Sequence, residues 1–260
     1  MAGNIHVSRD GHVGHLVFDH PERRNAITAE MWERIPEAAA ELDADPEVRV
    51  VVMRGIGETA FVSGADISEF ESNRTGSSAL EYEERNSRAF SSLAHMEKPL
   101  IALIHGFCVG GGCAIALTAD LRFAADDAVF AIPAGRLGLG YGMDGLETLV
   151  GVVGLPAAKE IFFTARRFTA DEALSMGLVN RVLAKVKLDE YVAEVVHQIS
   201  QNAPLTLKSA KLALGQIAGA PAQRDEKAVE AAIAACFDSE DYKEGVRAFL
   251  EKRSPDFKGR

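Results

Sequence analysis

Cysteine is scarce in this sequence, which has Cys108, Cys113 and Cys236 and no others among its 260 residues. An odd number of cysteines without paired spacing excludes a disulfide framework and favours reduced thiols, so we expect a cytoplasmic protein. Long apolar runs are also missing: no segment approaches the ~20 consecutive apolar residues that cross a bilayer, and the N-terminus lacks a signal-peptide pattern. We therefore expect no membrane partner and no export.

Basic residues are few relative to acidic ones. The sequence has 28 lysines and arginines against 38 aspartates and glutamates, which gives a formal net charge of −10. Nucleic-acid backbones are bound by surplus Lys and Arg, so this balance argues against a nucleic-acid partner, although a few local cations can hold a small polyanion. With 47% hydrophobic and 25% charged residues, the chain is long enough for one large domain, or one domain plus an appendage.

Two common phosphate and nucleophile motifs are absent, namely the Walker lysine and the G-x-S-x-G elbow. A literal G-x-G-x-x-G occurs at Gly140, Gly142 and Gly145, with Glu160 at the distance of a ribose-binding acid. We reject a dinucleotide site here, because Glu160 lies in a stretch with a helical pattern, whereas the ribose acid belongs at a strand end.

The most informative segment runs from residue 100 to residue 120. An apolar run at 100–105 predicts a buried strand, and three glycines at 110–112 precede an Ala/Leu-rich stretch at 113–119 that predicts a helix. Glycine lets a ligand approach the backbone, and the first turn of a helix offers unpaired N–H groups. The segment is either a site for negative charge on oxygen or a place where helix and strand pack closely.

A second glycine-bearing loop follows the predicted strand at 48–53. It reads Phe-x-x-Gly-Ala-Asp-Ile over 61–67 and opens a predicted helix at Asp66. Together with Gly-x-x-x-Gly-Gly-Gly-Cys at 106–113 and Asp-Leu-Arg at 120–122, it resembles the enoyl-CoA hydratase/isomerase (crotonase) family. The resemblance extends from the segment 21–26 to the C-terminal segment 244–253.

This resemblance implies an enzyme that acts on an acyl-CoA thioester, whose carbonyl is polarised by the backbone N–H groups of Ala65 and Gly111. CoA is then part of the substrate, and no separate cofactor and no metal are expected. The resemblance also implies a set of residues that bind the substrate and its CoA moiety, with the last two reaching across a subunit boundary: Arg23, Arg24, Ala26, Ser63, Ala65, Asp66, Ile67, Phe249 and Lys252.

Alternating predicted strands and helices indicate an α/β fold. The family resemblance implies a crotonase-like spiral of ββα turns over residues 1–187, which holds the thioester site, followed by a helical C-terminal region over 188–260. Apolar stripes in this second region exceed what one core needs. The resemblance implies that it packs on other subunits, so the expected assembly is a homotrimer or homohexamer.

The two glutamates with which hydratases of this family position a water are replaced by Ala114 and Ala134. Alanine cannot transfer a proton, so ordinary hydration is in doubt and the chain resembles an atypical member of the family. Tyr141 falls where methylmalonyl-CoA decarboxylase-like members have a tyrosine facing the substrate carboxylate, so it is either a hydrogen-bond donor to the substrate or a packed aromatic. Decarboxylation needs no strong base, because an oxyanion hole stabilises the enolate as carbon dioxide leaves. That branch, however, has histidine where this chain has Ala65.

Asp144 and Glu147 are the carboxylates left near Tyr141, beside a helix predicted to begin near Met143. Asp144 is either an acid or base, or a helix-start residue stabilised by the dipole. Cys113 is either a nucleophile with a depressed pKa or a small buried filler. Three functions stay open: an enzyme that forms a thioester enolate, a decarboxylase of a malonyl-type CoA, and a catalytically silent subunit that binds CoA thioesters.

Four local features complete the predictions. A hairpin is expected over 5–19 with its turn at Asp10-Gly11, and its histidines have no ligand spacing for a metal. Thr28 is expected to cap a helix. A polar loop over 71–78 is expected to cover the acyl pocket or to be an exposed linker, and a helix is expected over 82–96.

Overall fold

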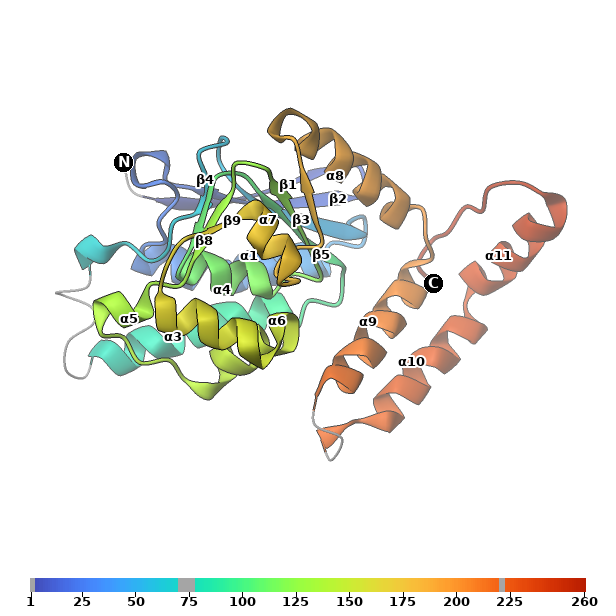
Figure 1. Ribbon diagram of the computed structural model, residues 1–260. Coiled ribbons are helices and arrows are strands. Elements are labelled where there is room, and N and C mark those ends of the chain that lie inside the picture. Colours follow the sequence, from blue (N-terminus) through green and yellow to red (C-terminus); the bar gives the residue numbers. More distant parts are fainter. Residues whose placement is uncertain (1–2, 70–77, 220–222) are drawn as a thin grey trace.

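The computed structural model describes residues 3–69, 78–219 and 223–260. Two sheets form its centre (Figure 1). The six-stranded sheet has the order β1 (Asn4–Asp10), β2 (Val13–Asp19), β3 (Val50–Gly55), β5 (Leu100–Ile104), β7 (Leu121–Ala125), β10 (Arg181–Leu183). The four-stranded sheet has the order β4 (Ala60–Val62), β6 (Phe107–Val109), β8 (Val129–Ala131), β9 (Phe168–Thr169).

The chain alternates between these sheets as it advances. Successive turns place β3, β5 and β7 side by side and parallel in the larger sheet, and β4, β6 and β8 side by side and parallel in the smaller one. Each pair of strands is followed by a helix: α3 (Ser78–Ala94), α4 (Gly111–Leu117) and α5 (Ala134–Leu137). This is a spiral of ββα turns, and the prediction of an α/β spiral is confirmed.

The remaining helices flank this spiral. They are α1 (Ala29–Ala44), α6 (Met143–Thr164), α7 (Ala170–Ser175), α8 (Lys185–Ser200), α9 (Pro204–Ala218), α10 (Glu226–Asp238) and α11 (Glu240–Glu251), with 3₁₀ turns at Pro21–Arg23 and Ile67–Glu69. Among the described residues no helix is both long and apolar enough to cross a membrane.

Both faces of the larger sheet are buried, which explains the continuous apolar runs of its central strands. Along β3, Val51 and Met53 face the main core against α1 and α3, whereas Val50 and Val52 face a second core. Helix α8 closes that second core with Leu188 and two valines further along it. The expected boundary after residue 187 therefore falls inside a helix that packs on the sheet.

Several local predictions hold at the level of hydrogen bonds. The Thr28 hydroxyl accepts from the Met31 N–H and caps α1, and α6 begins at Met143. The predicted hairpin is formed by β1 and β2, but its two-residue loop is Gly11-His12 rather than Asp10-Gly11, because Asp10 still pairs with Val13.

The segment after Asp66 begins with the 3₁₀ turn Ile67–Glu69, at the position where a helix was expected. The Asp66 carboxylate accepts from the Ser68 N–H and hydroxyl at 3.0 and 2.7 Å and caps this turn. The predicted loop over 71–78 lies outside the described residues apart from its last position. Helix α3 begins at Ser78, four residues before the predicted start of the helix expected over 82–96.

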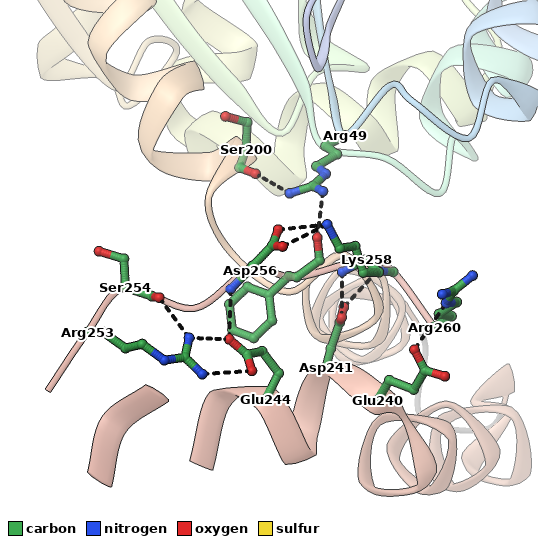
Figure 2. Close-up of polar contacts among 12 residues, drawn as sticks. Arg49, Ser200, Glu240, Asp241, Glu244, Arg253, Ser254, Asp256, Lys258 and Arg260 are labelled. Carbon is green, nitrogen blue, oxygen red and sulfur yellow. Dashed lines mark hydrogen bonds and ion pairs between the residues drawn. The ribbon is translucent and has the colours of Figure 1, made fainter. Parts of the chain in front are cut away.

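Helices α9, α10 and α11 form an arm that extends away from the sheets (Figure 1). The last residues of the chain, 253–260, return along α11 toward the sheets, and we call them the C-terminal strap. Figure 2 shows its contacts: Arg49 donates to the Ser200 and Phe257 carbonyls at 2.9 and 2.7 Å, and the buried Asp241 carboxylate accepts from the Lys258 N–H at 2.6 Å. The strap thus connects α11 to the spiral core.

Candidate functional site

Two loops leave the smaller sheet at one edge. Because β4 and β6 pair in parallel, the segments that follow them, 63–66 and 110–112, emerge side by side. A Cβ built on Gly111 would lie 3.7 Å from the Ala65 nitrogen, and one built on Gly64 would lie 3.9 Å from the Gly111 nitrogen. The backbones of Ala65 and Gly111 are therefore neighbours.

Glycine is required in this arrangement for two reasons. Gly64 has φ +113°, a conformation that side chains rarely adopt. A Cβ on Gly112 would overlap the Val62 carbonyl oxygen. These glycines let the two loops approach each other, so the glycine run does serve close packing. Close packing is also compatible with a site that binds negative charge on oxygen.

The N–H groups of Ala65 and Gly111 have no hydrogen-bond acceptor among the described residues, whereas the backbone groups next to them are hydrogen-bonded. The Ile27 N–H donates to the Gly64 carbonyl at 2.8 Å, and the Asp66 N–H donates to the Ile27 carbonyl at 2.9 Å. These bonds hold the loop on both sides of Ala65 and leave its own N–H available. Gly111 is the first residue of α4, where a helix does not use the N–H.

Both residues line one cavity of about 680 Å³. A volume of this order suits a small organic ligand. The cavity wall combines the two loops, one side of α3, parts of α4 and α5, and the start of α6. Of the predicted site residues it includes Ser63, Ala65, Ile67, Gly111 and Tyr141.

Ala114 and Ala134 also line the cavity, one from the first turn of α4 and the other from the start of α5. The positions at which the family resemblance places two glutamates thus face the same space as the free N–H groups. In this chain those positions contribute methyl groups and no proton carrier.

Tyr141 is placed in the cavity by the loop between α5 and α6. Its ring packs edge to face on Phe162, with 4.9 Å between centroids. Glu147 is not brought to the cavity: Gly145 and Thr148 line it, and at 3.6 residues per turn Glu147 lies on the opposite side of α6, where it is exposed.

Asp144 belongs to the first turn of α6. Its side chain lies outside the described part of the structure.

Helix α3 contributes a side of the cavity that the sequence analysis did not identify. A polar stripe at helical spacing faces inward and includes Glu83, Asn86, Ser87 and Ser91; His95, directly after the last residue of the helix, continues it, so the stripe holds two titratable side chains, Glu83 and His95. The sequence contains this stripe as polar residues spaced at i, i+3 and i+4, but a polar stripe on a helix is typical of a solvent-facing surface. Only the fold shows that this stripe faces a cavity.

Trp32 connects α3 to the Gly111 loop. Its indole N–H donates to the Tyr82 hydroxyl at 3.0 Å, and its ring packs edge to face on Phe90 with 5.4 Å between centroids. A Cβ on Gly111 would lie 3.3 Å from this indole ring. The buried tryptophan therefore fixes the distance between the polar stripe and the free N–H groups.

The Arg23-Arg24 segment is held next to the cavity-lining Ser63. The Ser63 hydroxyl donates to the Arg23 carbonyl at 3.0 Å, and its N–H donates to the Arg24 carbonyl at 3.2 Å. The buried Asn25 amide supports this turn by donating to the Ala60 carbonyl at 2.8 Å. Both arginines are exposed, while Ala26 is buried.

The Asp66 carboxylate belongs to the same region. Burial acts to raise the pKa of this carboxyl, but hydrogen bonds from Ser68 and the charge of Arg23 outweigh it, so the pKa of Asp66 is lowered. Asp66 does not line the cavity, although the residues on both sides of it do.

Phe249 and Lys252 are not brought to the cavity. Phe249 is 84% exposed and lines an apolar cleft between α9, α10 and α11. Lys252 ends α11. Figure 1 shows α11 on the other side of the chain from α3 and α5.

Cys113 is buried below the glycine run, and its thiol donates to the Cys108 carbonyl at 2.8 Å. It does not line the cavity. This placement favours the interpretation of Cys113 as a small buried filler. Among the described residues, no group of three or more His, Cys, Asp or Glu side chains is arranged to hold a metal ion.

Comparison with known proteins identifies the class. The model of the enoyl-CoA hydratase/isomerase family matches residues 8–260. A crystal structure of an enoyl-CoA hydratase/isomerase family protein from Hyphomonas neptunium superposes with a TM-score of 0.92 at 37% identity and covers 98% of each chain. The chain belongs to the enoyl-CoA hydratase/isomerase (crotonase) family.

Relatives with assigned reactions include more than one chemistry. The chain is 34% identical to the short-chain-enoyl-CoA hydratase of Clostridium acetobutylicum over 250 residues, 96% of this chain and 95% of that protein. It is 30% identical to the methylmalonyl-CoA decarboxylase of Escherichia coli over 258 residues, 98% of each. The family is therefore established, and the substrate and the reaction must be argued from the site.

Proposed function

We propose that this protein is an enzyme that stabilises the enolate of an acyl-CoA thioester in an oxyanion hole formed by the N–H groups of Ala65 and Gly111. The observation that carries the proposal is that these two N–H groups have no acceptor among the described residues, lie next to each other and line one cavity. Donors that are fixed before the reaction stabilise developing charge without reorganisation.

The proposed site suits an anion that is formed during the reaction. The methyl groups of Ala114 and Ala134 line the same cavity and exclude water from part of its wall. Electrostatic stabilisation is stronger where water is excluded. The same methyl groups cannot donate or accept a proton, so any proton transfer needs another group.

Decarboxylation of a malonyl-type CoA is a second candidate reaction. It is supported by Tyr141 in the cavity wall and by the absence of carboxylates at Ala114 and Ala134, because loss of carbon dioxide yields the enolate without a base. The similarity to a methylmalonyl-CoA decarboxylase supports it as well. For reactions that do require proton transfer, the titratable side chains lining the described cavity are Glu83, His95 and Tyr141.

Arg23 and Arg24 are proposed to bind the CoA phosphates beside the cavity mouth, together with the backbone around Ala26 and Asp66. CoA enters as part of the substrate, and no further cofactor is proposed. The exposed apolar side chains of α9–α11 support assembly into a homotrimer or homohexamer, in which Phe249 and Lys252 of one subunit would approach the CoA of another. Sedimentation of the purified chain tests this part, and a monomer at micromolar concentration would contradict it.

The reaction is tested by steady-state turnover of crotonyl-CoA and methylmalonyl-CoA, with calorimetric binding of each ester measured in parallel. Turnover of either ester supports an enzyme, and release of carbon dioxide from methylmalonyl-CoA selects the decarboxylase. Tight binding of acyl-CoA without turnover of any ester or exchange of its α-protons would contradict the proposal and favour a silent binding subunit.

A further inference from the structure

Helix α11 carries Phe249 in its last turn, ends at Lys252 and lies on the outer side of the arm (Figure 1). Among the described residues, no hydrogen bond or ion pair joins this helix directly to the spiral. Beyond its N-cap Ser239, its polar partners belong to the C-terminal strap. The strap is therefore the polar link through which the spiral can hold α11.

The strap is bound tightly along the first half of α11. The buried Asp241 carboxylate accepts from the Lys258 and Gly259 N–H groups at 2.6 and 2.8 Å. One turn further along, a Cβ on Gly245 would lie 3.4 Å from the Phe257 ring, so this ring packs directly on the helix. The strap and α11 thus behave as one unit.

The strap also fixes the end of α11. Lys252 has φ +54°, a left-handed conformation that side chains rarely adopt. The next residue, Arg253, donates its N–H to the Ala248 carbonyl at 3.0 Å and its guanidinium to the Glu244 carboxylate at 2.5 and 3.0 Å (Figure 2). These bonds hold Lys252 in its unusual conformation.

Arg49 is the residue of the spiral to which the strap is hydrogen-bonded. It directly precedes β3, is half-buried, and donates to the Ser200 carbonyl at the end of α8 and to the Phe257 carbonyl, at 2.9 and 2.7 Å (Figure 2). In the part of the chain that the structure describes, no other hydrogen bond or ion pair joins the strap to the spiral. A guanidinium presents its N–H groups in a rigid planar fork, so two carbonyls bound at once are fixed relative to each other.

We propose that Arg49 is a positioning residue for CoA: by fixing the strap, it holds Phe249 and Lys252 where they contact the CoA bound by another subunit. This inference rests on the proposed function, in which these two residues of one subunit approach the CoA of another. Arg49 does not line the cavity, so its effect on CoA runs through the strap and α11.

The chemistry of the two positioned residues defines what Arg49 affects. The Phe249 ring is 84% exposed and suits stacking on the base of CoA, and the Lys252 ammonium suits a phosphate. Both contacts require close approach, so an arm that shifts relative to the spiral loses them while its helices stay folded. Arg49 is therefore expected to raise affinity for the nucleotide half of CoA and to leave the chemistry at the thioester unchanged.

The test measures calorimetric dissociation constants for butyryl-CoA and for S-butyryl-pantetheine, which has the same thioester without the nucleotide. Arg49→Met removes both donors, and we expect it to weaken butyryl-CoA binding about 5- to 150-fold, the range for one stacked base. Binding of S-butyryl-pantetheine, and kcat on the ester that the protein consumes, should stay unchanged. Arg34→Met, which removes the same charge from surface ion pairs on α1, should alter neither affinity.

Further variants separate positioning from a general loss of stability. Arg49→Lys keeps the charge but not the fork, so its affinity for butyryl-CoA should lie between those of Arg49→Met and the unmodified protein. In a protein that already carries Phe249→Ala with Lys252→Ala, Arg49→Met should cause no further loss. If Arg49→Met does not fold, Arg253→Met loosens the strap at Glu244 and should give the same pattern.

The outcomes distinguish this inference from the function on which it rests. If Phe249→Ala with Lys252→Ala weakens butyryl-CoA binding but the Arg49 and Arg253 variants do not, the inference is overturned and the proposed CoA contacts stand. Equal weakening of both ligands by Arg49→Met, or dissociation of its assembly in sedimentation, also overturns the inference. If Phe249→Ala with Lys252→Ala has no effect, the proposed CoA contacts fail and the inference fails with them.

Discussion

Replacing Gly111 with proline removes one of the two proposed oxyanion donors, and the structure supplies a matched control. Gly111 is the first residue of α4, a position where proline is favoured because the helix does not use that N–H. A Cβ at this position would lie 3.3 Å from the Trp32 ring. Gly111→Ala and Gly111→Pro both introduce that crowding, whereas only proline loses the donor.

The expected difference between the two variants follows from the strength of one such donor. Loss of a single oxyanion donor costs about 2.7–4 kcal/mol of transition-state stabilisation, or roughly 10²- to 10³-fold in kcat. We therefore expect Gly111→Pro to turn over the preferred acyl-CoA about 10²- to 10³-fold more slowly than Gly111→Ala, while the two variants unfold at similar temperatures. The fall should appear in kcat, because the CoA moiety is proposed to bind at the Arg23-Arg24 segment and not at Gly111.

The assay is steady-state turnover of whichever ester the unmodified protein consumes, with calorimetric affinity and thermal unfolding measured on the same preparations. Affinity is needed because the proline ring places a carbon where the N–H pointed. Equal kcat values for the proline and alanine variants would refute the reasoning, since the Gly111 N–H would then contribute nothing to the transition state.

Three further predictions follow from the same structure. The double substitution Ala114→Glu with Ala134→Glu should raise the hydration rate on crotonyl-CoA, because a general acid or base contributes typically 10²- to 10⁴-fold; brisk hydration by the unmodified protein would show that another group already supplies the protons. Tyr141→Phe should slow turnover of methylmalonyl-CoA while leaving affinity for CoA nearly unchanged, and an unchanged rate would remove Tyr141 from the reaction. Asp241→Asn should destabilise the protein by about 1–3 kcal/mol, because this buried carboxylate accepts two N–H groups of the C-terminal strap at 2.6 and 2.8 Å; proteolysis that stays unchanged near the C-terminus would contradict that role.

The sequence predicted the parts of the site that consist of backbone. Glycine runs after apolar strands indicate where the chain turns closely and where N–H groups stay free, and both loops occur where they were expected. The side chains were harder to place. Glu147 is near Tyr141 along the chain, yet the helix turns it to the opposite side.

The α3 stripe escaped prediction for a related reason. From Glu83 to Ser91 the helix carries polar residues that an isolated helix would present to water, and nothing local shows that the first turns of α4 and α5 face them across a cavity. The packing of α8 was also not predictable locally, because its apolar stripe does not show that its partner is the far face of the six-stranded sheet.

The site therefore combines two kinds of structure that can change independently. The free N–H groups of Ala65 and Gly111 depend on strand pairing and glycine, so substitutions on α3 leave them in place. The polar side chains of the cavity wall come mainly from α3 and from the loop that carries Tyr141. Since Trp32 connects these parts by packing, changes of polar side chains on α3 should leave the positions of the Ala65 and Gly111 N–H groups unchanged. Under the proposed function, substrate choice by the side chains of α3 is therefore separable from enolate stabilisation by the N–H groups of Ala65 and Gly111.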